Sequence, residues 1–146
     1  MKISTKGRYG LRTMIDLAIN YNAGYIPLKD IAKRQELSEK YLEQIMTPLN
    51  RGGLVNSIRG AQGGYTLKHP AEEITVGMVL RALEGSLSPV DCIDREDSCG
   101  HSEQCISIYV WKKLKNAIDD VVDNITLADL VKLGSEMKLE QTDYFI

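Results

Sequence analysis

All three cysteines of the 146-residue chain lie in one short stretch, at Cys92, Cys99 and Cys105, and His101 lies among them. Thiols this close together, mixed with an imidazole and several carboxylates, are typical of a ligand loop for a soft metal centre. Three thiols are one ligand short of a closed site, and His101 is the nearest imidazole. The other possible fourth ligands are a solvent species, a small thiol or a carboxylate of this stretch: Asp94, Asp97 and Glu103.

An odd, clustered set of cysteines indicates metal binding or redox chemistry rather than a disulfide framework. Thiolates are the usual ligands of iron–sulfur clusters, while three cysteines and one histidine also make an ordinary zinc site. An enzyme is disfavoured, because Cys, His and Asp share one acidic loop without an oxyanion or phosphate cradle. No apolar run is long enough for a membrane span and the start lacks a signal peptide, so we expect a cytoplasmic protein.

The charge of the chain is divided unevenly between its two halves. Residues 1–68 carry 11 Lys and Arg against 5 Asp and Glu, whereas residues 69–146 carry 7 against 15. The N-terminal half therefore suits a polyanion such as nucleic acid, although the pI of the whole chain is about 5.7. Lys6 and Arg8 lie at the start of the first predicted helix, where a cation gains nothing from the helix dipole, so a nearby anion is expected.

The elements that follow predict a DNA-binding half. Apolar residues recur at helical spacing over 5–22, and shorter helical patterns cover 28–34 and 39–51. Ser38 is a good N-cap for the third helix, and the glycines at 52–53 end it. Two short helices separated by a tight turn predict a helix-turn-helix.

A β-hairpin is expected directly behind the helix-turn-helix. Two short strand-like runs, 54–58 and 65–67, are joined by the glycine-rich, cationic turn 59–64. A cationic hairpin in this place is a wing. The order of helix, turn, helix and wing favours DNA binding over generic packing of helices on a hairpin.

A long helix is expected after the cysteine stretch. Thr75 caps a helix over 76–84, the cysteine stretch follows without periodicity, and a long helical pattern begins at about Ser102. Its apolar stripe exceeds what a domain of this size needs for its own core, and predicts a helix that pairs with its twin in a homodimer. Packing on the chain's own first helix is the alternative, and both can hold at once. The stripe contains Ile106, Tyr109 or Val110, Leu114, Ala117 or Ile118, Val121 and Ile125.

These patterns predict a mainly α fold with a small β-hairpin, in which a winged helix-turn-helix domain is joined to a long dimerisation helix. The DNA-binding domain covers 1–84 and the cysteine-containing sensor loop 85–105. The dimerisation helix and a last short helix, 127–133, fall within 106–133, and 134–146 is a tail.

Several motifs are recognisable at this point. The chain resembles the Rrf-type (BadM-related) winged helix-turn-helix transcriptional regulators over roughly residues 1 to 133, and is IscR-like with CymR-like features. The resemblance implies a homodimeric repressor that binds a palindromic operator in double-stranded DNA through two recognition helices and two wings. The motifs are Met1-Lys2-Ile3-Ser4-Thr5-Lys6-Gly7-Arg8-Tyr9-Gly10, Ser38-Glu39-Lys40-Tyr41-Leu42-Glu43-Gln44, Arg59-Gly60-Ala61-Gln62-Gly63-Gly64-Tyr65 and Asn124-Ile125-Thr126-Leu127.

The residue types predict how the DNA would be bound. Basic residues at the helix starts suit phosphates. Glu43 can accept from cytosine N4 and Gln44 can bind adenine in the major groove, and Arg59 suits a narrow minor groove. The set expected at the DNA is Lys6, Arg8, Ser38, Lys40, Tyr41, Glu43, Gln44, Arg59, Gly60, Gln62 and Gly63, with Tyr41 packing rather than stacking on bases.

For the cysteine loop, the resemblance implies an iron–sulfur cluster, [2Fe-2S], held by the three cysteines, with zinc or no metal as alternatives. Two departures concern the fourth ligand. Six residues separate Cys92 from Cys99, where the IscR pattern has five, and Ile108 stands where IscR has its ligand histidine. The aspartate that NsrR takes from the partner's first helix is also missing, so His101 stays the candidate.

A second function is a CymR-like repressor of cysteine metabolism controlled by a partner protein. The C-terminal Tyr144-Phe145-Ile146 resembles the short Ile-ending peptides that bind O-acetylserine sulfhydrylase, the cysteine synthase. An exposed aromatic tail that ends in isoleucine fits binding of a peptide in a pocket.

Overall fold

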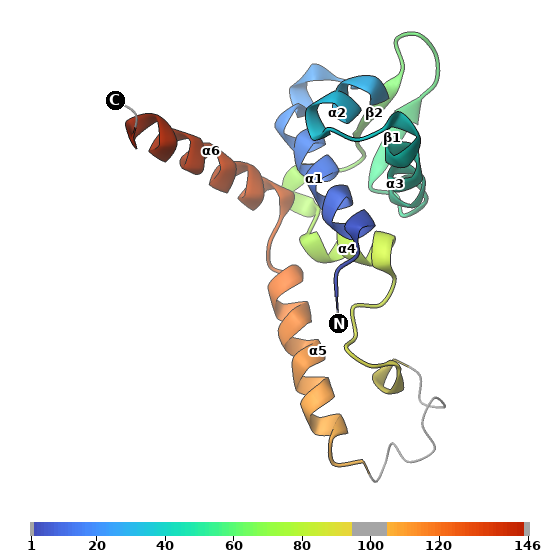
Figure 1. Ribbon diagram of the computed structural model, residues 1–146, viewed down its shortest axis with the longest axis vertical. Coiled ribbons are helices and arrows are strands. Elements are labelled where there is room, and N and C mark those ends of the chain that lie inside the picture. Colours follow the sequence, from blue (N-terminus) through green and yellow to red (C-terminus); the bar gives the residue numbers. More distant parts are fainter. Residues whose placement is uncertain (1, 95–104, 145–146) are drawn as a thin grey trace.

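The structure is a computed structural model that describes residues 2–94 and 105–144, with side chains described as far as Lys138. Its described part is mostly helical and contains one two-stranded antiparallel hairpin (Figure 1), which confirms the predicted fold class. In chain order the elements are α1 (Thr5–Ile19), η1 (Tyr21–Ala23), α2 (Leu28–Gln35), α3 (Glu39–Arg51), β1 (Val55–Ile58), β2 (Gly64–Leu67), η2 (Ala71–Glu73), α4 (Val76–Glu84), η3 (Asp91–Ile93), α5 (Ile108–Val122) and α6 (Leu127–Tyr144).

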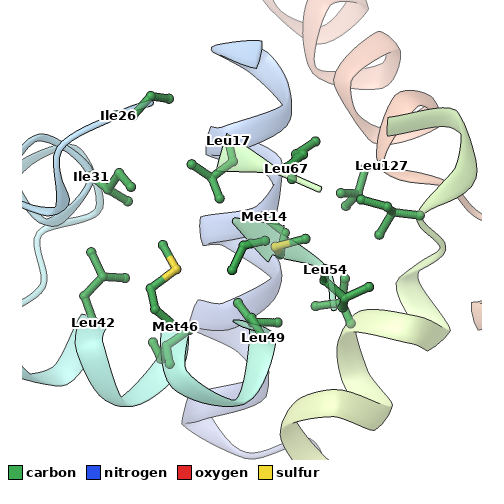
Figure 2. Packing of buried hydrophobic residues seen from close by; sticks show 14 of the residues in the cluster. Met14, Leu17, Ile26, Ile31, Leu42, Met46, Leu49, Leu54, Leu67 and Leu127 are labelled. Atoms are coloured by element: carbon green, nitrogen blue, oxygen red, sulfur yellow. The ribbon is translucent and has the colours of Figure 1, made fainter. Parts of the chain in front are cut away.

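The core lies around α1. Met14 and Leu17 of α1 are fully buried, and they pack with the apolar face of α3 and with Leu127 at the start of α6 (Figure 2). Large apolar side chains in this position each contribute about 1.5–3 kcal/mol when buried. This core fixes α3 on α1 and leaves the opposite face of α3 to solvent.

The hairpin is attached to the helix-turn-helix by the segment that precedes α2. Val55 pairs with Leu67 and Ile58 with Gly64 in the antiparallel register. Ile26 and Tyr65 exchange both backbone hydrogen bonds, each at 2.9 Å. The wing is thereby held at a fixed place beside α2 and α3.

Two helix ends differ from the sequence prediction. α1 ends at Ile19 rather than near Asn22, and Asn20 caps this end: its backbone N–H, at 3.1 Å, and its side-chain amide, at 2.9 Å, both donate to the Asp16 carbonyl. The helix expected from about Ser102 begins at Ile108. Ile106 is 91% exposed, so nothing there compensates for the cost of ordering a further turn.

The predicted length of the last helix, 127–133, is also wrong, because α6 has 18 residues and continues through Gly134 to Tyr144. A glycine inside a helix costs only about 1 kcal/mol relative to alanine, and strong helix formers follow it. Residues 134–144 are therefore helical rather than a polar tail.

α5 and the far part of α6 extend away from the winged helix-turn-helix domain (Figure 1). None of the α5 residues, all of which the structure describes, is buried. Within the described residues, no helix combines the length and hydropathy needed to cross a membrane.

Candidate DNA-binding surface and cysteine loop

The N-terminus of α3 is capped as the sequence predicts. The Ser38 hydroxyl accepts from the Tyr41 backbone N–H at 3.1 Å, in extended backbone geometry. This cap stabilises the first turn of α3 by about 1 kcal/mol. Beyond it Lys40, Glu43 and Gln44 are exposed, so the capped end of α3 presents a polar face.

Tyr41 is oriented by packing within the protein. Its ring lies edge-on to Tyr9 of α1 with centroids 6.2 Å apart, and the guanidinium of Arg12 lies 5.2 Å from the Tyr9 centroid. Edge-to-face pairs contribute about 0.5–1.5 kcal/mol beyond their buried area. Tyr41 therefore helps to fix the capped end of α3 on α1.

The tight turn of the wing depends on two glycines. Gly60 has φ 111°, a conformation that favours glycine. At Gly63 an added Cβ would lie 2.1 Å from the Ile58 carbonyl oxygen, so only glycine fits this turn. Arg59 and Gln62 are exposed at its tip.

An open groove of about 460 Å³ lies between α3 and the wing and brings together Glu43 and Arg59. Tyr65 also lines it, and burial together with the nearby negative charge of Glu43 raises the pKa of this phenol. Lys6 and Arg8 lie elsewhere, on the first turn of α1, where Arg8 donates to the Thr5 hydroxyl at 3.4 Å. Of the residues predicted to bind DNA, Glu43 and Arg59 thus line one groove, whereas Lys6 and Arg8 lie apart from it at the start of α1.

A buried ion pair that the sequence did not predict joins α2 to α1. The Asp16 carboxylate is 6% exposed and accepts from Arg34 at 2.9 and 2.7 Å and from Gln35 at 3.0 Å. The hydrogen bond to Asp16 raises the pKa of Arg34 above its ordinary value. Gln35 in turn accepts from Arg12 at 3.2 Å. An acidic residue within the apolar pattern of α1 was the only signal of this network in the sequence.

The described ends of the cysteine loop place two of the three thiols. Cys92 lies in η3 and Cys105 lies just before α5, and both are half-buried free thiols. Cys99 and His101 lie outside the described residues. Near Cys92, the Asp94 carboxylate accepts hydrogen bonds from the hydroxyls of Ser86 and, at 2.6 Å, Ser88.

Local hydrogen bonds make the Cys105 thiol more acidic. The Ser107 hydroxyl lies 3.0 Å from its sulfur, and hydrogen bonds from that hydroxyl and from the Ile108 backbone lower the pKa of the thiol. A more acidic thiol gives up its proton more easily to a soft metal. Within the described ranges, no three His, Cys, Asp or Glu side chains are close enough to hold a metal ion. The complete ligand set stays a prediction.

One side of α5 borders an apolar groove of about 550 Å³. Leu114, Ile118 and Val121 line it from α5, and Leu80 and Leu87 line it from α4 and the start of the loop. Tyr109 and Val121 are 63% and 58% exposed. A contiguous apolar surface of this kind is typical of a protein interface.

The fold and the groove between α3 and the wing define a winged helix-turn-helix DNA-binding protein. The chain belongs to the Rrf2 family, whose model, described as "Iron-dependent Transcriptional regulator", matches residues 3–133. Members of this family are transcriptional regulators, and the expected resemblance is confirmed.

Three relatives illustrate the match. The chain is 46% identical to the HTH-type transcriptional regulator CymR of Bacillus subtilis (strain 168), over 89% of each chain. It is 43% identical to the HTH-type transcriptional regulator IscR of Pectobacterium atrosepticum, covering 90% of this chain and 79% of that protein. The solved structure of T. potens IscR superimposes with a TM-score of 0.76 at 44% identity, covering 94% of this chain and 90% of that one.

Proposed function

We propose that this DNA-binding regulator acts in the cytoplasm as a homodimeric repressor on a palindromic operator. The observation that carries the proposal is the groove in which Glu43 of α3 and Arg59 of the wing lie on opposite sides. With α3 in the major groove, Glu43 and Gln44 would face base edges, and Arg59 would reach the adjacent minor groove. Exposed Lys40 would hold a phosphate.

The dimer is proposed from the surface of α5. Its apolar side chains are exposed along the helix, and the groove beside it is mainly apolar. A second copy of the same helix would cover this surface in a self-complementary two-fold interface. Two winged domains would then meet two half-sites of one operator.

Substitution of the wing arginine tests the DNA contact. Arg59→Ala should lose about tenfold in affinity, or about 1.4 kcal/mol, on operators with A/T-rich flanks, where a narrow minor groove attracts a guanidinium. Arg59→Lys is the matched control, because it keeps the charge for phosphates and loses the planar group. Fluorescence anisotropy over a salt series measures both variants. Equal affinity of Arg59→Ala and the parent on every flank would remove this role.

We further propose that the cysteine loop senses iron–sulfur or redox status. Cys92, Cys99 and Cys105 would hold a [2Fe-2S] cluster with His101 as the fourth ligand, and a bound cluster would supply iron–thiolate bonds sensitive to oxidation. The acidic Cys105 thiol and the family description support this proposal. Because the loop joins α4 to the N-terminal end of α5, a bound cluster would act on how the dimer helix is held relative to the DNA-binding domain.

Anaerobic purification tests the cluster. Visible absorption with matching iron and sulfide contents is expected for the parent, and their loss is expected for Cys105→Ser. A zinc-loaded or metal-free protein would contradict the cluster and favour a thiol switch. Gel shift of apo and reconstituted protein on one operator then tests sensing, and identical affinities would exclude a switch.

The second candidate is a CymR-like repressor of cysteine metabolism controlled by cysteine synthase. Its support is the similarity to CymR of Bacillus subtilis, which is described as a global cysteine regulator. Deletion of 143–146 should abolish pull-down of O-acetylserine sulfhydrylase. Unchanged pull-down would dismiss this candidate.

A further inference from the structure

α5 is attached to the DNA-binding domain by backbone hydrogen bonds just beyond its C-terminal end, by an ion-pair network, and by Ile118 and Val122, which pack against the apolar cluster of Val76, Leu80 and Leu87. Two backbone bonds tie the segment between α5 and α6 to the start of α4: Val76 donates to Ile125 at 2.8 Å, and Leu127 donates to Ile74 at 2.9 Å. From this end α5 extends away from the domain (Figure 1). These backbone bonds fix the position of the C-terminal end of α5, but other contacts set the direction of the helix.

A fork of ion pairs supplies a second attachment. Arg81 of α4 donates to Asp123 at 2.5 and 3.0 Å, and its Nη2 also donates to Asp119, one turn further along α5, at 2.8 Å. Lys115 donates to the other oxygen of Asp119, also at 2.8 Å. One planar guanidinium thus spans two successive turns of α5 and restricts its direction.

Gly77 allows the two helices to approach each other at this point. A Cβ added to Gly77 would lie 2.1 Å from an Asp123 carboxylate oxygen and 2.6 Å from Arg81 Nη1. It would also lie 3.1 Å from a methyl carbon of Val122. The absence of a side chain at Gly77 therefore makes room for the fork.

The fork contributes more to orientation than to stability. Its side chains are 28–43% exposed, and ion pairs this accessible to water contribute little to stability. Bidentate geometry nevertheless restricts angles even where the energy is modest. The hydrogen bond to Asp123 raises the pKa of Arg81, and the hydrogen bond from Lys115 lowers the pKa of Asp119, so both groups are charged at neutral pH.

The length of α5 makes its direction matter. A helix of 15 residues is about 22 Å long, so a rotation of about 10° at the joint moves its far end by about 4 Å. One base pair of DNA is about 3.4 Å along the axis. A small change at the joint is therefore comparable with one base pair of operator spacing.

We propose that Arg81 is a positioning residue that sets the direction of α5 on the DNA-binding domain and thereby selects the half-site spacing of the operator. The inference rests on the proposed homodimer through α5. In a dimer, the distance between the two recognition helices depends on the angle between α5 and the DNA-binding domain in each copy. Arg81 touches no DNA in this scheme and acts through α5.

In vitro selection from random double-stranded DNA tests the inference without a known operator. The parent should enrich inverted repeats with one spacing. Arg81→Met keeps the aliphatic stem and removes the fork, and should enrich the same half-sites over a range of spacings. Gly77→Ala is an independent variant that pushes the joint apart while improving local helix propensity. Asp120→Asn, which removes an exposed carboxylate beside Asp119, is the matched control and should behave as the parent.

Binding titrations then measure the effect. The parent should prefer its selected spacing over a spacing one base pair longer by at least about tenfold, or about 1.4 kcal/mol, and Arg81→Met should retain less than about threefold. Sedimentation checks that both are dimers. The same single spacing for parent, Arg81→Met and Gly77→Ala would overturn the role of Arg81 and leave the proposed function standing. A parent that enriches no inverted repeat would overturn the proposed function itself.

Discussion

The buried carboxylate of Asp16 is the polar group of α1 to which Arg34 and Gln35 of α2 are hydrogen-bonded. Asp16→Asn removes a charge that accepts three hydrogen bonds of 3.0 Å or less from Arg34 and Gln35. Hydrogen bonds to charged groups are worth about 1.5–3 kcal/mol each. The Arg34 side chain is 43% exposed and regains water when released, so its two bonds count at the low end. We expect the free energy of unfolding to fall by about 3 kcal/mol.

Thermal and urea unfolding followed by circular dichroism measure this loss. At about 2–4 °C per kcal/mol for a chain of this size, Asp16→Asn should lower the Tm by about 10 °C. The control is Asp120→Asn, which removes an exposed carboxylate of α5 and should leave the Tm unchanged. A Tm for Asp16→Asn close to that of the parent would refute the reasoning that this carboxylate holds α2 on α1.

Three other substitutions have defined outcomes. Leu114→Glu should dissociate the dimer in sedimentation, because each α5 would bury a carboxylate in an apolar interface, and an intact dimer would reject α5 as that interface. Bonds to Lys115 and Arg81 lower the pKa of Asp119, so its contribution to stability is present above about pH 4 and is lost as the pH falls through that lowered pKa. Asp119→Asn should accordingly unfold more easily than the parent near neutral pH, with the difference shrinking as the pH falls below about 4, and a constant difference would contradict this cause. Gly134→Ala should stabilise α6 by about 1 kcal/mol, since an added Cβ meets nothing within 4 Å, and a lower Tm would contradict it.

Local signals in the sequence were sufficient for the helix-turn-helix and the wing. Ser38 caps α3 as expected, and the glycine-rich turn after Arg59 forms the hairpin. These features depend on residues close together in the chain, where capping and turn preferences act. The periodicity also predicted the apolar stripe of α5, of which Leu114 and Val121 are exposed while Ile118 packs against the apolar cluster at α4.

Contacts between distant residues could not be predicted in this way. The fork from Arg81 to Asp119 and Asp123 joins positions some forty residues apart, and nothing in the local pattern distinguishes it from charges on a solvated face. The predicted last helix ends before Gly134, whereas α6 continues through this glycine to Tyr144. A single glycine costs a helix less than the residues around it supply.

The start of α1 shows that the N-terminus of a helix can be paired with an anion from within the chain. Lys6 and Arg8 at a helix N-terminus predicted a nearby anion, and the structure supplies one from within the chain. The Glu84 carboxylate at the end of α4 accepts from the Ser4 backbone N–H at 3.0 Å and from the Ser4 hydroxyl, beside the first turn of α1. A carboxylate in this place is stabilised by the helix dipole. Glu84 therefore already places a negative charge at the N-terminus of α1. The phosphate contacts predicted for Lys6 and Arg8 rest instead on the family and on exposure, since Arg8 is exposed and Lys6 is half-exposed.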